Sequence, residues 1–382
     1  CFEMEKMDIV LAAPTGRAAK RMTEATGYEA KTIHRLLEVS GGIEDGDSSH
    51  FEKNEDNPIE ADAVILDEMS MVDIHLMYSL LKAIVPGTRL ILVGDSNQLP
   101  SVGPGNVLKD IIDSKAFSVV RLSKIYRQAE SSHIVLNAHK INAGELITLD
   151  NKNKDFFFFE KKDVRSVMGA LVYLVKTRLP EYIGASPFEI QVLTPMRKGE
   201  LGVEHLNEVL QYYLNPASES KKEKEGRTGV FREGDKVMQV KNNYKLEWKI
   251  TNAKGFSIEE GLGVFNGDMG IIKQINTYSE RITVVFDENR EAEYPFSSLD
   301  ELELAYAITI HKSQGSEYPA VVLPLLSGPP ILCNRNLLYT AITRAQKCVA
   351  IAGRQSMVEQ MIHNETEQKR YSGLNDCLKE GL

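Results

Sequence analysis

The first third of the chain alternates between short apolar runs and amphipathic stretches. The apolar runs lack the in-and-out alternation of a half-exposed strand, and turn residues follow them, so they predict buried strands. We expect these strands at residues 8–13, 63–67, 89–95 and 118–122. We expect helices at residues 17–25 and 30–39 and in a segment that ends near residue 85. Apolar strands that alternate with helices are typical of a parallel sheet covered on both faces.

Residues 40–60 interrupt this pattern with repeated Gly, Ser, Asp and Glu, and they fit a solvated loop and a small inserted hairpin about equally well. The strand and helix pattern returns after residue 150. We expect strands at 155–159 and 189–194 and helices at 163–183 and 203–213. The sequence therefore predicts a second α/β unit.

The sequence pattern changes after this second unit. Residues 215–226 are rich in Ser, Lys and Glu, which predicts a linker. Between residues 230 and 300, short β runs are separated by turn residues such as Asn266-Gly267, which predicts an antiparallel barrel. The α/β texture resumes at Ala305, with strands near 320–324 and 348–352, so the barrel is inserted into the second α/β domain. The last dozen residues are polar and predict a tail.

Composition narrows the class of protein without naming a function. A length of 382 residues predicts two to three domains, and no apolar run approaches the roughly 18 residues that span a bilayer. Charged residues precede the first apolar run, so we expect no secretory leader. A net charge of −9 excludes a wholly basic coat but allows a local basic channel. The four cysteines are scattered, which predicts thiols in a reducing cytoplasm and neither a zinc site nor disulfides.

Two strand ends carry the residues with the clearest chemistry. Asp67 and Glu68 follow the strand AVIL, where carboxylates face the ligand crevice of an open α/β sheet. An aspartate there can hold Mg²⁺, and a neighbouring glutamate can polarise a water molecule that attacks a phosphate. Gln98 follows the next strand in a Gly-Asp turn, where it can sense a γ-phosphate. Each signal is weak alone, because a solvated turn and a polar loop explain them equally well.

Taken together, these segments resemble a known family. Residues 67–73 (DEMSMVD) and 93–105 (VGDSNQLPSVGPG) resemble motifs II and III of superfamily 1 helicases, and are most similar to the RecD family, which comprises the alpha subunit of exodeoxyribonuclease V and its stand-alone relatives. Six further segments resemble other parts of the family's motif series in the right order. They are residues 13–19 (APTGRAA), 32–37 (TIHRLL), 126–128 (YRQ), 193–197 (LTPMR), 309–317 (TIHKSQGSE) and 339–345 (YTAITRA).

The resemblance implies an α/β fold of two RecA-like parallel-sheet domains of the P-loop NTPase type with a small inserted β-barrel. The first motor domain would occupy residues 1–122, with a hairpin pin at 40–60 whose short, acidic sequence makes a strand-separating role doubtful. The second would occupy 123–226 and 304–382, and a barrel of the Src-homology-3 type would occupy 227–303.

The resemblance also implies ATP and Mg²⁺ as cofactors and assigns a role to each matching residue. Asp67 would bind Mg²⁺, Glu68 would be the catalytic base and Gln98 would sense the γ-phosphate. Arginine has a permanent charge and a fork of donors, which suits it to phosphate. Phosphates or nucleotide would also be contacted by Arg127, Arg344, Gly315 and Glu317.

The single-stranded DNA side follows the same logic. Threonine and serine hydroxyls near strand ends suit contacts with DNA phosphates, which set position rather than sequence, while histidines and lysine could add charge or stack on bases. The expected nucleic-acid residues are Thr15, Gly16, Arg17, His34, Thr194, Pro195, Thr309, His311, Lys312 and Ser313. A structural role explains His34 as well as a DNA contact does.

One required element is absent from the sequence. An ATP motor of this class needs the phosphate-binding loop G-x-x-x-x-G-K-[ST], and no segment of the chain matches it. In the family this loop precedes motif Ia, where the chain has only about a dozen residues and begins with Cys1. We therefore expect an N-terminally truncated piece that does not hydrolyse ATP, with apolar surface left uncovered in the first domain; a natural subunit that has lost the loop is the alternative.

The resemblance implies a parent protein that is an ATP-dependent helicase. It would move 5′→3′ on single-stranded DNA in recombination or repair, act at junctions of duplex and single strand, and have nuclease-complex subunits as candidate partners. Two other hypotheses stay open: a non-catalytic module that binds single-stranded DNA or serves as a scaffold, and a helicase domain of a conjugative relaxase. RNA substrates also stay open.

Overall fold

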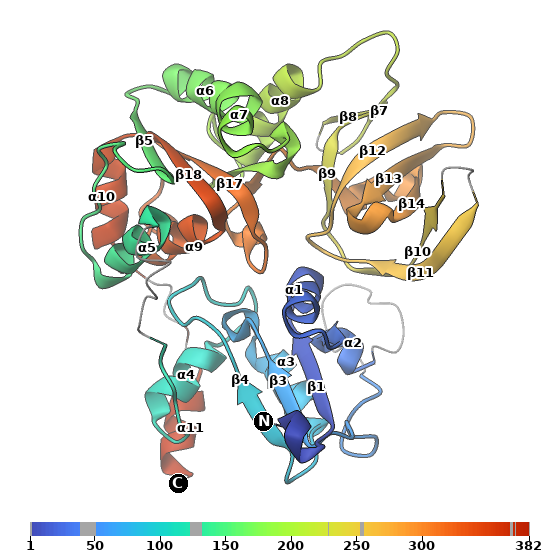
Figure 1. Ribbon diagram of the computed structural model, residues 1–382, viewed down its shortest axis with the longest axis vertical. Helices are drawn as coiled ribbons and strands as arrows, with labels where there is room; N and C mark the ends of the chain where they lie inside the picture. Colours follow the sequence, from blue (N-terminus) through green and yellow to red (C-terminus); the bar gives the residue numbers. More distant parts are fainter. Residues whose placement is uncertain are drawn as a thin grey trace. The chain divides into compact units, whose positions relative to one another are not determined.

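The computed structural model describes residues 2–38, 51–122, 132–227, 229–252, 256–366, 370 and 372–381. The chain forms two compact units (Figure 1). The first comprises Cys1–Lys124 with Gln368–Leu382, and the second comprises Ile125–Glu367. Within the described residues, no helix has the length and apolar character needed to cross a membrane.

A parallel sheet of four strands forms the first unit. Its order is β2-β1-β3-β4. The strands are β1 (Ile9–Ala13), β2 (Ala30–Thr32), β3 (Ala63–Leu66) and β4 (Arg89–Leu92). The helices are η1 (Phe2–Glu5), α1 (Gly16–Thr26), α2 (Ile33–Leu36), η2 (Met69–Met71), α3 (Ile74–Lys82), α4 (Val107–Ser114) and α11 (Leu374–Glu380).

The first unit departs from the sequence-based expectation in three places. Residues 118–122 form no strand, and Val120 and Leu122 are exposed instead of buried. The expected helix at 30–39 begins only at Ile33, because residues 30–32 pair with β1 and the Thr32 hydroxyl caps the helix. Residues 40–50 of the suspected pin lie outside the described residues, and 51–60 form bends with isolated bridge residues at Phe51 and Ile59.

The C-terminal segment is a further correction. The sequence assigned residues 304–382 to the second motor domain and predicted a polar tail. Residues 368–382 instead belong to the first unit, where α11 packs on α4. Leu374 packs its partly buried side chain against the core around β3, and Ser372 and Asn375 bind Asp110 of α4.

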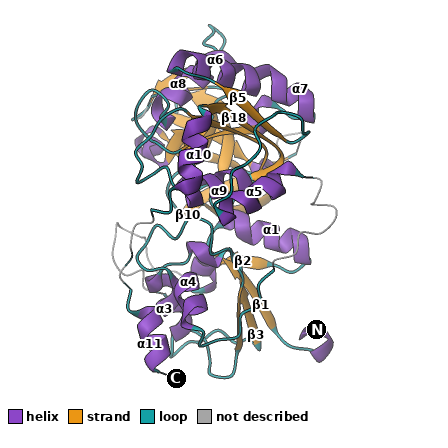
Figure 2. Cartoon of the chain, turned by 90° about the vertical axis from the view of Figure 1, so that its left-hand side faces the viewer, coloured by secondary structure: helices purple, strands orange, loops and turns teal. Residues whose placement is uncertain are grey.

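The second unit contains a parallel sheet of five strands in the order β16-β6-β17-β18-β5. Helices α6, α7 and α8 lie on one face of this sheet and α5, α9 and α10 on the other (Figures 1 and 2). The strands are β5 (Phe156–Glu160), β6 (Ile190–Thr194), β16 (Ala307–Thr309), β17 (Tyr318–Leu325) and β18 (Ala345–Gly353). The helices are α5 (His133–Ala143), α6 (Val164–Tyr173), a π-helical turn η3 (Leu174–Arg178), α7 (Leu179–Ile183), η4 (Pro187–Glu189), α8 (Val203–Leu214), η7 (His311–Ser313), α9 (Arg335–Thr343) and α10 (Gln355–His363).

An antiparallel sheet is inserted between β6 and β16, as the sequence predicted. Its seven strands follow the order β11-β10-β14-β13-β12-β9-β15. They are β9 (Lys236–Gln239), β10 (Asn243–Thr251), β11 (Ser257–Val264), β12 (Met269–Asn276), β13 (Arg281–Phe286), β14 (Glu291–Pro295) and β15 (Leu302–Leu304), with the turns η5 (Asp287–Asn289) and η6 (Phe296–Glu301). The expected linker at 215–226 is not wholly irregular, because β7 (Glu223–Glu225) pairs with β8 (Val230–Arg232).

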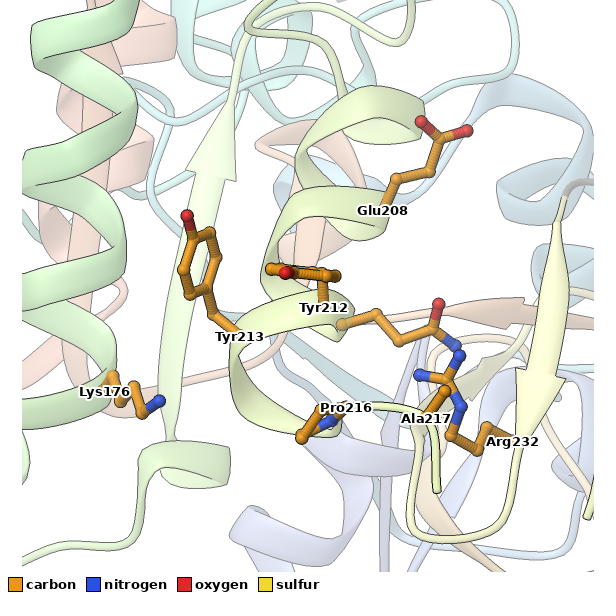
Figure 3. Close-up of a pocket in the computed structure, with 8 residues that line it drawn as sticks. Lys176, Glu208, Tyr212, Tyr213, Pro216, Ala217 and Arg232 are labelled. Carbon is orange, nitrogen blue, oxygen red and sulfur yellow. The ribbon is translucent and has the colours of Figure 1, made fainter. Parts of the chain in front are cut away.

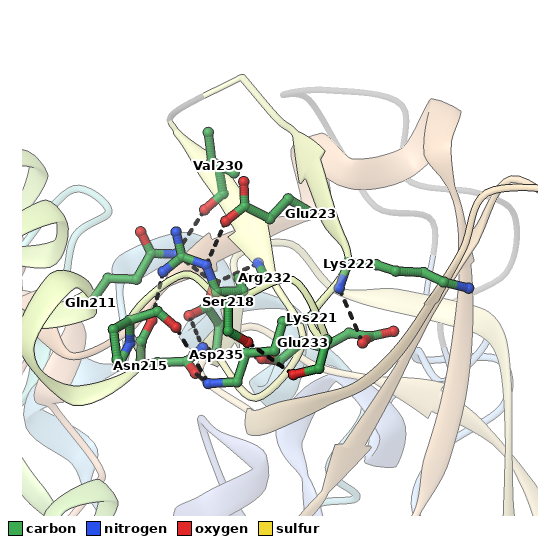
Figure 4. A network of polar contacts seen from close by, with 12 residues as sticks. Gln211, Asn215, Ser218, Lys221, Lys222, Glu223, Val230, Arg232, Glu233 and Asp235 are labelled. Carbon is green, nitrogen blue, oxygen red and sulfur yellow. Dashed lines mark hydrogen bonds and ion pairs between the residues drawn. The ribbon is translucent and has the colours of Figure 1, made fainter.

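A buried polar cluster joins the inserted sheet to α8 (Figure 4). At its centre the Asp235 carboxylate, with no exposed surface, accepts hydrogen bonds from Gln211 Nε2 at 2.6 Å and Asn215 Nδ2 at 2.7 Å. It also accepts from the Arg232 amide at 2.6 Å and the Tyr306 hydroxyl at 2.9 Å. One apolar core runs through both sheets of this unit, so the insertion is packed on the α/β domain and not merely tethered to it.

Candidate functional site

Three strand ends of the first unit meet at one edge of its sheet. β1, β3 and β4 are parallel and hydrogen-bonded in register, so the residues that follow them lie at the same edge. Thr15 follows β1, Asp67 and Glu68 follow β3, and residues 93–98 follow β4. This edge therefore gathers the residues that the sequence assigned to Mg²⁺, base and phosphate sensor.

The turn at Asp67 and Glu68 is tightly held. The Asp67 amide donates to the Ala12 carbonyl at 3.0 Å, and Asp67 Oδ1 accepts from the Glu68 amide at 2.8 Å. Glu68 has φ 53° and ψ 41°, a left-handed conformation that costs a residue with a Cβ about 1–2 kcal/mol. The next amide, from Met69, donates to the Val93 carbonyl at 3.0 Å. The backbone at Glu68 is therefore strained at this edge of the sheet. Such strain is common at functional sites.

The loop after β4 places a glutamine oxygen without a partner. Asp95 accepts from the Asn97 amide at 2.9 Å and from Gln98 Nε2 at 3.5 Å. Gln98 Oε1 is buried and, among the described residues, accepts no hydrogen bond. Gly94 permits the close approach of this loop to the preceding turn, since a Cβ there would lie 2.9 Å from the Met69 nitrogen. A buried acceptor of this kind is suited to a donor such as a bound water molecule.

The motif Ia region and His34 lie on the neighbouring helices. The Thr15 hydroxyl caps α1 by accepting from the Ala18 amide at 3.2 Å, and Gly16 and Arg17 begin that helix. The His34 ring lies 6.0 Å from the Phe51 ring. Burial lowers the pKa of His34, and the nearby Asp73 carboxylate only partly opposes this. His34 is therefore neutral near pH 7, which removes the expected positive charge and leaves stacking or a structural role.

Two of the expected DNA-binding hydroxyls in the second unit are buried. Thr194 ends β6 with no exposed surface, and its hydroxyl donates to the Leu201 carbonyl at 2.7 Å. Ser313 is equally buried, and its hydroxyl donates to the Ile310 carbonyl at 2.7 Å. Pro195 is also buried. Both hydroxyls hold the local backbone, so the structure offers a structural role for Thr194 and Ser313 beside the expected contact with phosphate.

Cationic side chains do gather at the carboxyl ends of β6 and β16. The Glu303 carboxylate binds Lys312 Nζ at 2.9 Å and Arg197 Nη2 at 2.7 Å. Burial alone would raise the pKa of Glu303, but the hydrogen bond and charge of Lys312, together with Arg197, bring it below its usual value. Thr309 is half-buried and His311 is exposed beside this group. Arg197 Nε also lies 3.4 Å from Glu204 Oε1, so two cations and two carboxylates form this cluster.

Arg344 is a buried cation. It caps α9 with 3% of its surface exposed, and its guanidinium donates to the Ser316 carbonyl and the Thr343 hydroxyl, both at 3.3 Å. Its Nε has no partner, and among the described residues no carboxylate pairs with it. Gly315 and Glu317 lie between η7 and β17. Gly315 has a φ of +70°, and the Glu317 carboxylate accepts a hydrogen bond from Gln346 Nε2 at 3.2 Å. The other expected phosphate arginine, Arg127, lies outside the described residues.

Family models match three separate parts of the chain. Residues 2–104 match the model of an AAA domain. Residues 206–286 match the ATP-dependent RecD-like DNA helicase SH3 domain, and residues 304–352 match the UvrD-like helicase C-terminal domain.

Relatives of known name align along most of the chain. The ATP-dependent RecD2 DNA helicase of Deinococcus radiodurans is 36% identical over 91% of this chain, and the RecBCD enzyme subunit RecD of Mycolicibacterium smegmatis is 30% identical over 97%. The chain belongs to the RecD-like family of superfamily 1 helicases. It spans 43% of the first relative's length and 66% of the second's.

Solved structures agree with the RecD-like fold. A structure of two Pif1 helicases at forked duplex DNA has a TM-score of 0.52 at 20% identity, and covers 94% of this chain and 85% of that one. The Pif1 helicase from Bacteroides with ADP-AlF3 and single-stranded DNA has the same score and identity, with 93% and 84% covered. Both confirm the α/β architecture expected from the sequence.

One pocket of the second unit lies apart from the motif residues. It has a volume of about 580 Å³ and lies between α8 and η3 (Figure 3). Tyr212, Tyr213 and Lys176 line it, and none of the helicase-like motifs contributes to it. The motif residues lie instead at strand ends, where function in this class of fold is expected.

Sequence reasoning missed Arg197 as a candidate functional residue of the RecD-like chain. It stands at the end of a segment that was recognised, but no role was given to it. Its relation to Lys312 depends on Glu303, which lies 106 positions further along the chain. Only the fold brings the two cations to one carboxylate.

Proposed function

We propose that this chain is the motor portion of an ATP-dependent DNA helicase that moves 5′→3′ on single-stranded DNA in recombination or repair. The observation that carries the proposal is the guanidinium of Arg344, which is buried without a carboxylate among the described residues. Removing a cation from water costs several kcal/mol unless an anion compensates it. A phosphate oxygen supplies that anion, and the fork of arginine donors matches it.

The first unit supplies the groups for hydrolysis. Asp67 has one carboxylate oxygen committed to the Glu68 amide, so its other oxygen is the proposed ligand of Mg²⁺. When bound, Mg²⁺ would neutralise phosphate charge. Within the described residues, no three acidic, histidine or cysteine side chains form a metal cluster, which fits an ion that keeps most of its waters. Glu68 accepts the proton of the attacking water, and Gln98 Oε1 orients that water.

The second unit supplies a proposed path for the DNA backbone. Arg197, Lys312 and Thr309 lie at the carboxyl ends of β6 and β16, and His311 is exposed beside them. The guanidinium and ammonium groups can donate to phosphates in place of the Glu303 and Glu204 carboxylates, and an exposed imidazole suits a base. The complex of the Bacteroides Pif1 helicase with single-stranded DNA supports this choice of ligand.

Partners and compartment are proposals of the same kind. The Mycolicibacterium relative is named as a RecBCD subunit, which supports work within a nuclease complex. Burial raises the pKa of the Cys333 thiol to about 11 and that of Cys348 to about 12, so these free cysteines suit a reducing cytoplasm.

The sequence contains no G-x-x-x-x-G-K-[ST] segment. We therefore propose that the chain as printed does not hydrolyse ATP, because no lysine of this kind reaches the phosphates. The same observation favours a second candidate function, in which the chain binds single-stranded DNA without using ATP.

The test measures phosphate release from Mg-ATP, with and without single-stranded DNA. The chain as printed is compared with a longer form in which a strand, a phosphate-binding loop and a helix precede residue 1. We expect release only from the longer form, stimulated by DNA. Glu68→Gln in that form should lower release about 10²–10⁴-fold, and Glu24→Gln, on the exposed face of α1, is the matched control.

Each outcome decides between the candidates. DNA-stimulated release by the chain as printed would contradict the account of its phosphate site. No release by the longer form, combined with salt-sensitive DNA binding that ATP does not change, would favour the binding module. Normal turnover in Glu68→Gln would remove Glu68 as the base.

A further inference from the structure

The last described segment of the chain returns to the first unit and binds the loop after β4. Arg370 makes this contact. Its Nη1 donates to the Ser101 hydroxyl at 3.1 Å and to the carbonyl oxygens of Gly103 at 2.5 Å and Gly105 at 2.9 Å. Its Nη2 donates to the Ser101 carbonyl at 2.5 Å. One guanidinium therefore holds three carbonyl groups of one loop, which the rigid fork of five donors allows.

The opposite side of this loop is fixed by the start of α3. The Pro104 carbonyl accepts from the Ile74 amide at 3.0 Å. Gly103 lies against the Asp73 carboxylate so closely that a Cβ would overlap it, and Asp73 itself caps α3 by accepting from Leu76 at 2.8 Å. The loop is therefore held between a helix start on one side and Arg370 on the other.

Gln98 stands three positions before Ser101 in the same loop. Leu99 is buried in between, and Ser101 is 3% exposed, with its hydroxyl donating to the Gly103 carbonyl at 3.1 Å. The backbone that carries Gln98 is thus fixed at its distal end by the contacts of Arg370. A shift of this segment moves Gln98, whose buried Oε1 has no hydrogen-bond partner among the described residues.

Arg370 is itself anchored by the residues that follow it. The Ser372 hydroxyl binds the Asp110 carboxylate on α4, and Asn375 Nδ2 donates to the Asp110 carbonyl at 3.4 Å. Leu374 packs into the core of the unit. Because α4 begins directly after the loop, the C-terminal segment and the loop share one support.

We propose that Arg370 is a positioning residue for the phosphate-sensing loop: it sets the place of Gln98 without touching substrate. The proposal rests on the proposed ATP hydrolysis at this edge. Arg370 also lies seven positions after α10, the last helix of the second unit, so the segment that holds the loop is covalently continuous with the unit that contains Arg344.

Two measurements on the same variants test this. The variants are Arg370→Ala, Arg370→Lys and the control Lys379→Ala, which removes an exposed cation from α11. Amide hydrogen exchange is measured on the chain as printed. ATP turnover with single-stranded DNA is measured on the form that carries a phosphate-binding loop before residue 1, with thermal unfolding recorded for every variant.

For Arg370→Ala we expect amides of residues 101–106 to exchange about 10-fold faster, with β3 unchanged. We expect kcat to fall about 10-fold with the KM for ATP unchanged, because a displaced group costs turnover more than binding. Arg370→Lys should be intermediate, since lysine keeps the charge and loses the fork, and it tests the idea even if the alanine variant unfolds.

Wild-type exchange in loop 101–106 would overturn the proposal, and so would faster exchange throughout the unit in equal measure, which marks a merely structural role. Faster loop exchange with an unchanged kcat would also overturn it. If the unsubstituted longer form shows no turnover, the proposed function fails instead, and the exchange result still shows whether Arg370 holds the loop.

Discussion

Replacing Asp235 by alanine should destabilise the second unit far more than removing a surface carboxylate. The side chain of Asp235 is completely buried and accepts four hydrogen bonds, from Gln211, Asn215, Arg232 and Tyr306, all between 2.6 and 2.9 Å. These donors come from α8 and its C-cap, from β8, and from the residue that precedes β16. Alanine leaves the Arg232 amide and the Tyr306 hydroxyl without this acceptor, while Gln211 Nε2 and Asn215 Nδ2 each lose one of two hydrogen bonds and keep the one to a carbonyl group.

The magnitude follows from the cost of unsatisfied groups. Each buried donor that loses its partner costs about 1–3 kcal/mol, although side-chain donors can turn towards other acceptors. The backbone amide of Arg232 cannot turn. We therefore expect a loss of about 3–5 kcal/mol in the free energy of unfolding, the range seen when one partner of a buried charged network is removed. The matched control is Asp300→Ala, whose exposed ion pair with Lys241 contributes about 0–1 kcal/mol.

The chain provides its own probe for this measurement. Trp248 is its single tryptophan and lies partly buried in β10 of the second unit. Urea unfolding followed by tryptophan fluorescence therefore reports on the unit that contains Asp235. With a slope of about 3 kcal/mol per M urea for a unit of this size, the midpoint should move by about 1–1.7 M. A midpoint shift no larger than that of Asp300→Ala would refute the reasoning.

The Asp235→Asn variant tests the direction in which burial shifts the pKa of Asp235. Burial raises the pKa of Asp235 above its usual value, although the hydrogen bonds of Asn215 and the Arg232 amide oppose this. The stability contributed by the neutral carboxyl is full below the unfolded pKa near 4 and is lost as pH rises through the folded pKa. Wild type should therefore lose stability relative to Asp235→Asn as the pH rises from 4. A constant difference between the two proteins would contradict the raised pKa.

Three further predictions concern motif residues. Arg344→Gln should leave the nucleotide-free chain as stable as wild type or more stable in urea, since it removes a buried charge, and should lower ATP turnover of the loop-bearing form about 10³-fold. Because burial lowers the pKa of His34, wild-type stability relative to His34→Gln should be full above pH 6.5 and decline as pH falls through the folded pKa, which thermal unfolding at several pH values can follow. Thr194→Val should cost about 1–3 kcal/mol of stability without weakening single-stranded DNA binding, whereas Thr309→Val should weaken it in a fluorescence titration.

The local pattern of the sequence was sufficient for most elements of the fold. Buried apolar runs predicted β1, β3, β4 and β6, and turn residues predicted the hairpins of the inserted sheet. The failures share one cause. The run at 118–122 has the composition of a buried strand, yet among the described residues it pairs with no neighbour and leaves Val120 exposed, and strand pairing is a property of the whole sheet.

The prediction of a polar C-terminal tail failed for a related reason. Its composition is polar, so nothing local distinguishes a solvated tail from a helix that docks through a few residues. Leu374 and Arg370 make the contacts that decide this, with partners more than 260 positions away. Contacts across such a separation leave no periodic signal in the residues that make them.

The motif residues fall into two groups according to whether their buried polar atoms have a hydrogen-bond partner. Thr194 and Ser313 have hydroxyls near strand ends, as Thr309 does, but both donate to carbonyl groups within 2.7 Å. Their place in the motif is explained by the backbone they hold. Gln98 and Arg344 also lie in motifs, yet each retains a buried atom without a partner among the described residues. Since an unsatisfied buried atom is costly, a residue type that keeps one at a strand end is better explained by a ligand than by the fold. The same criterion explains Thr194 and Ser313 by the scaffold, and it supports the proposal that Gln98 and Arg344 each bind a ligand.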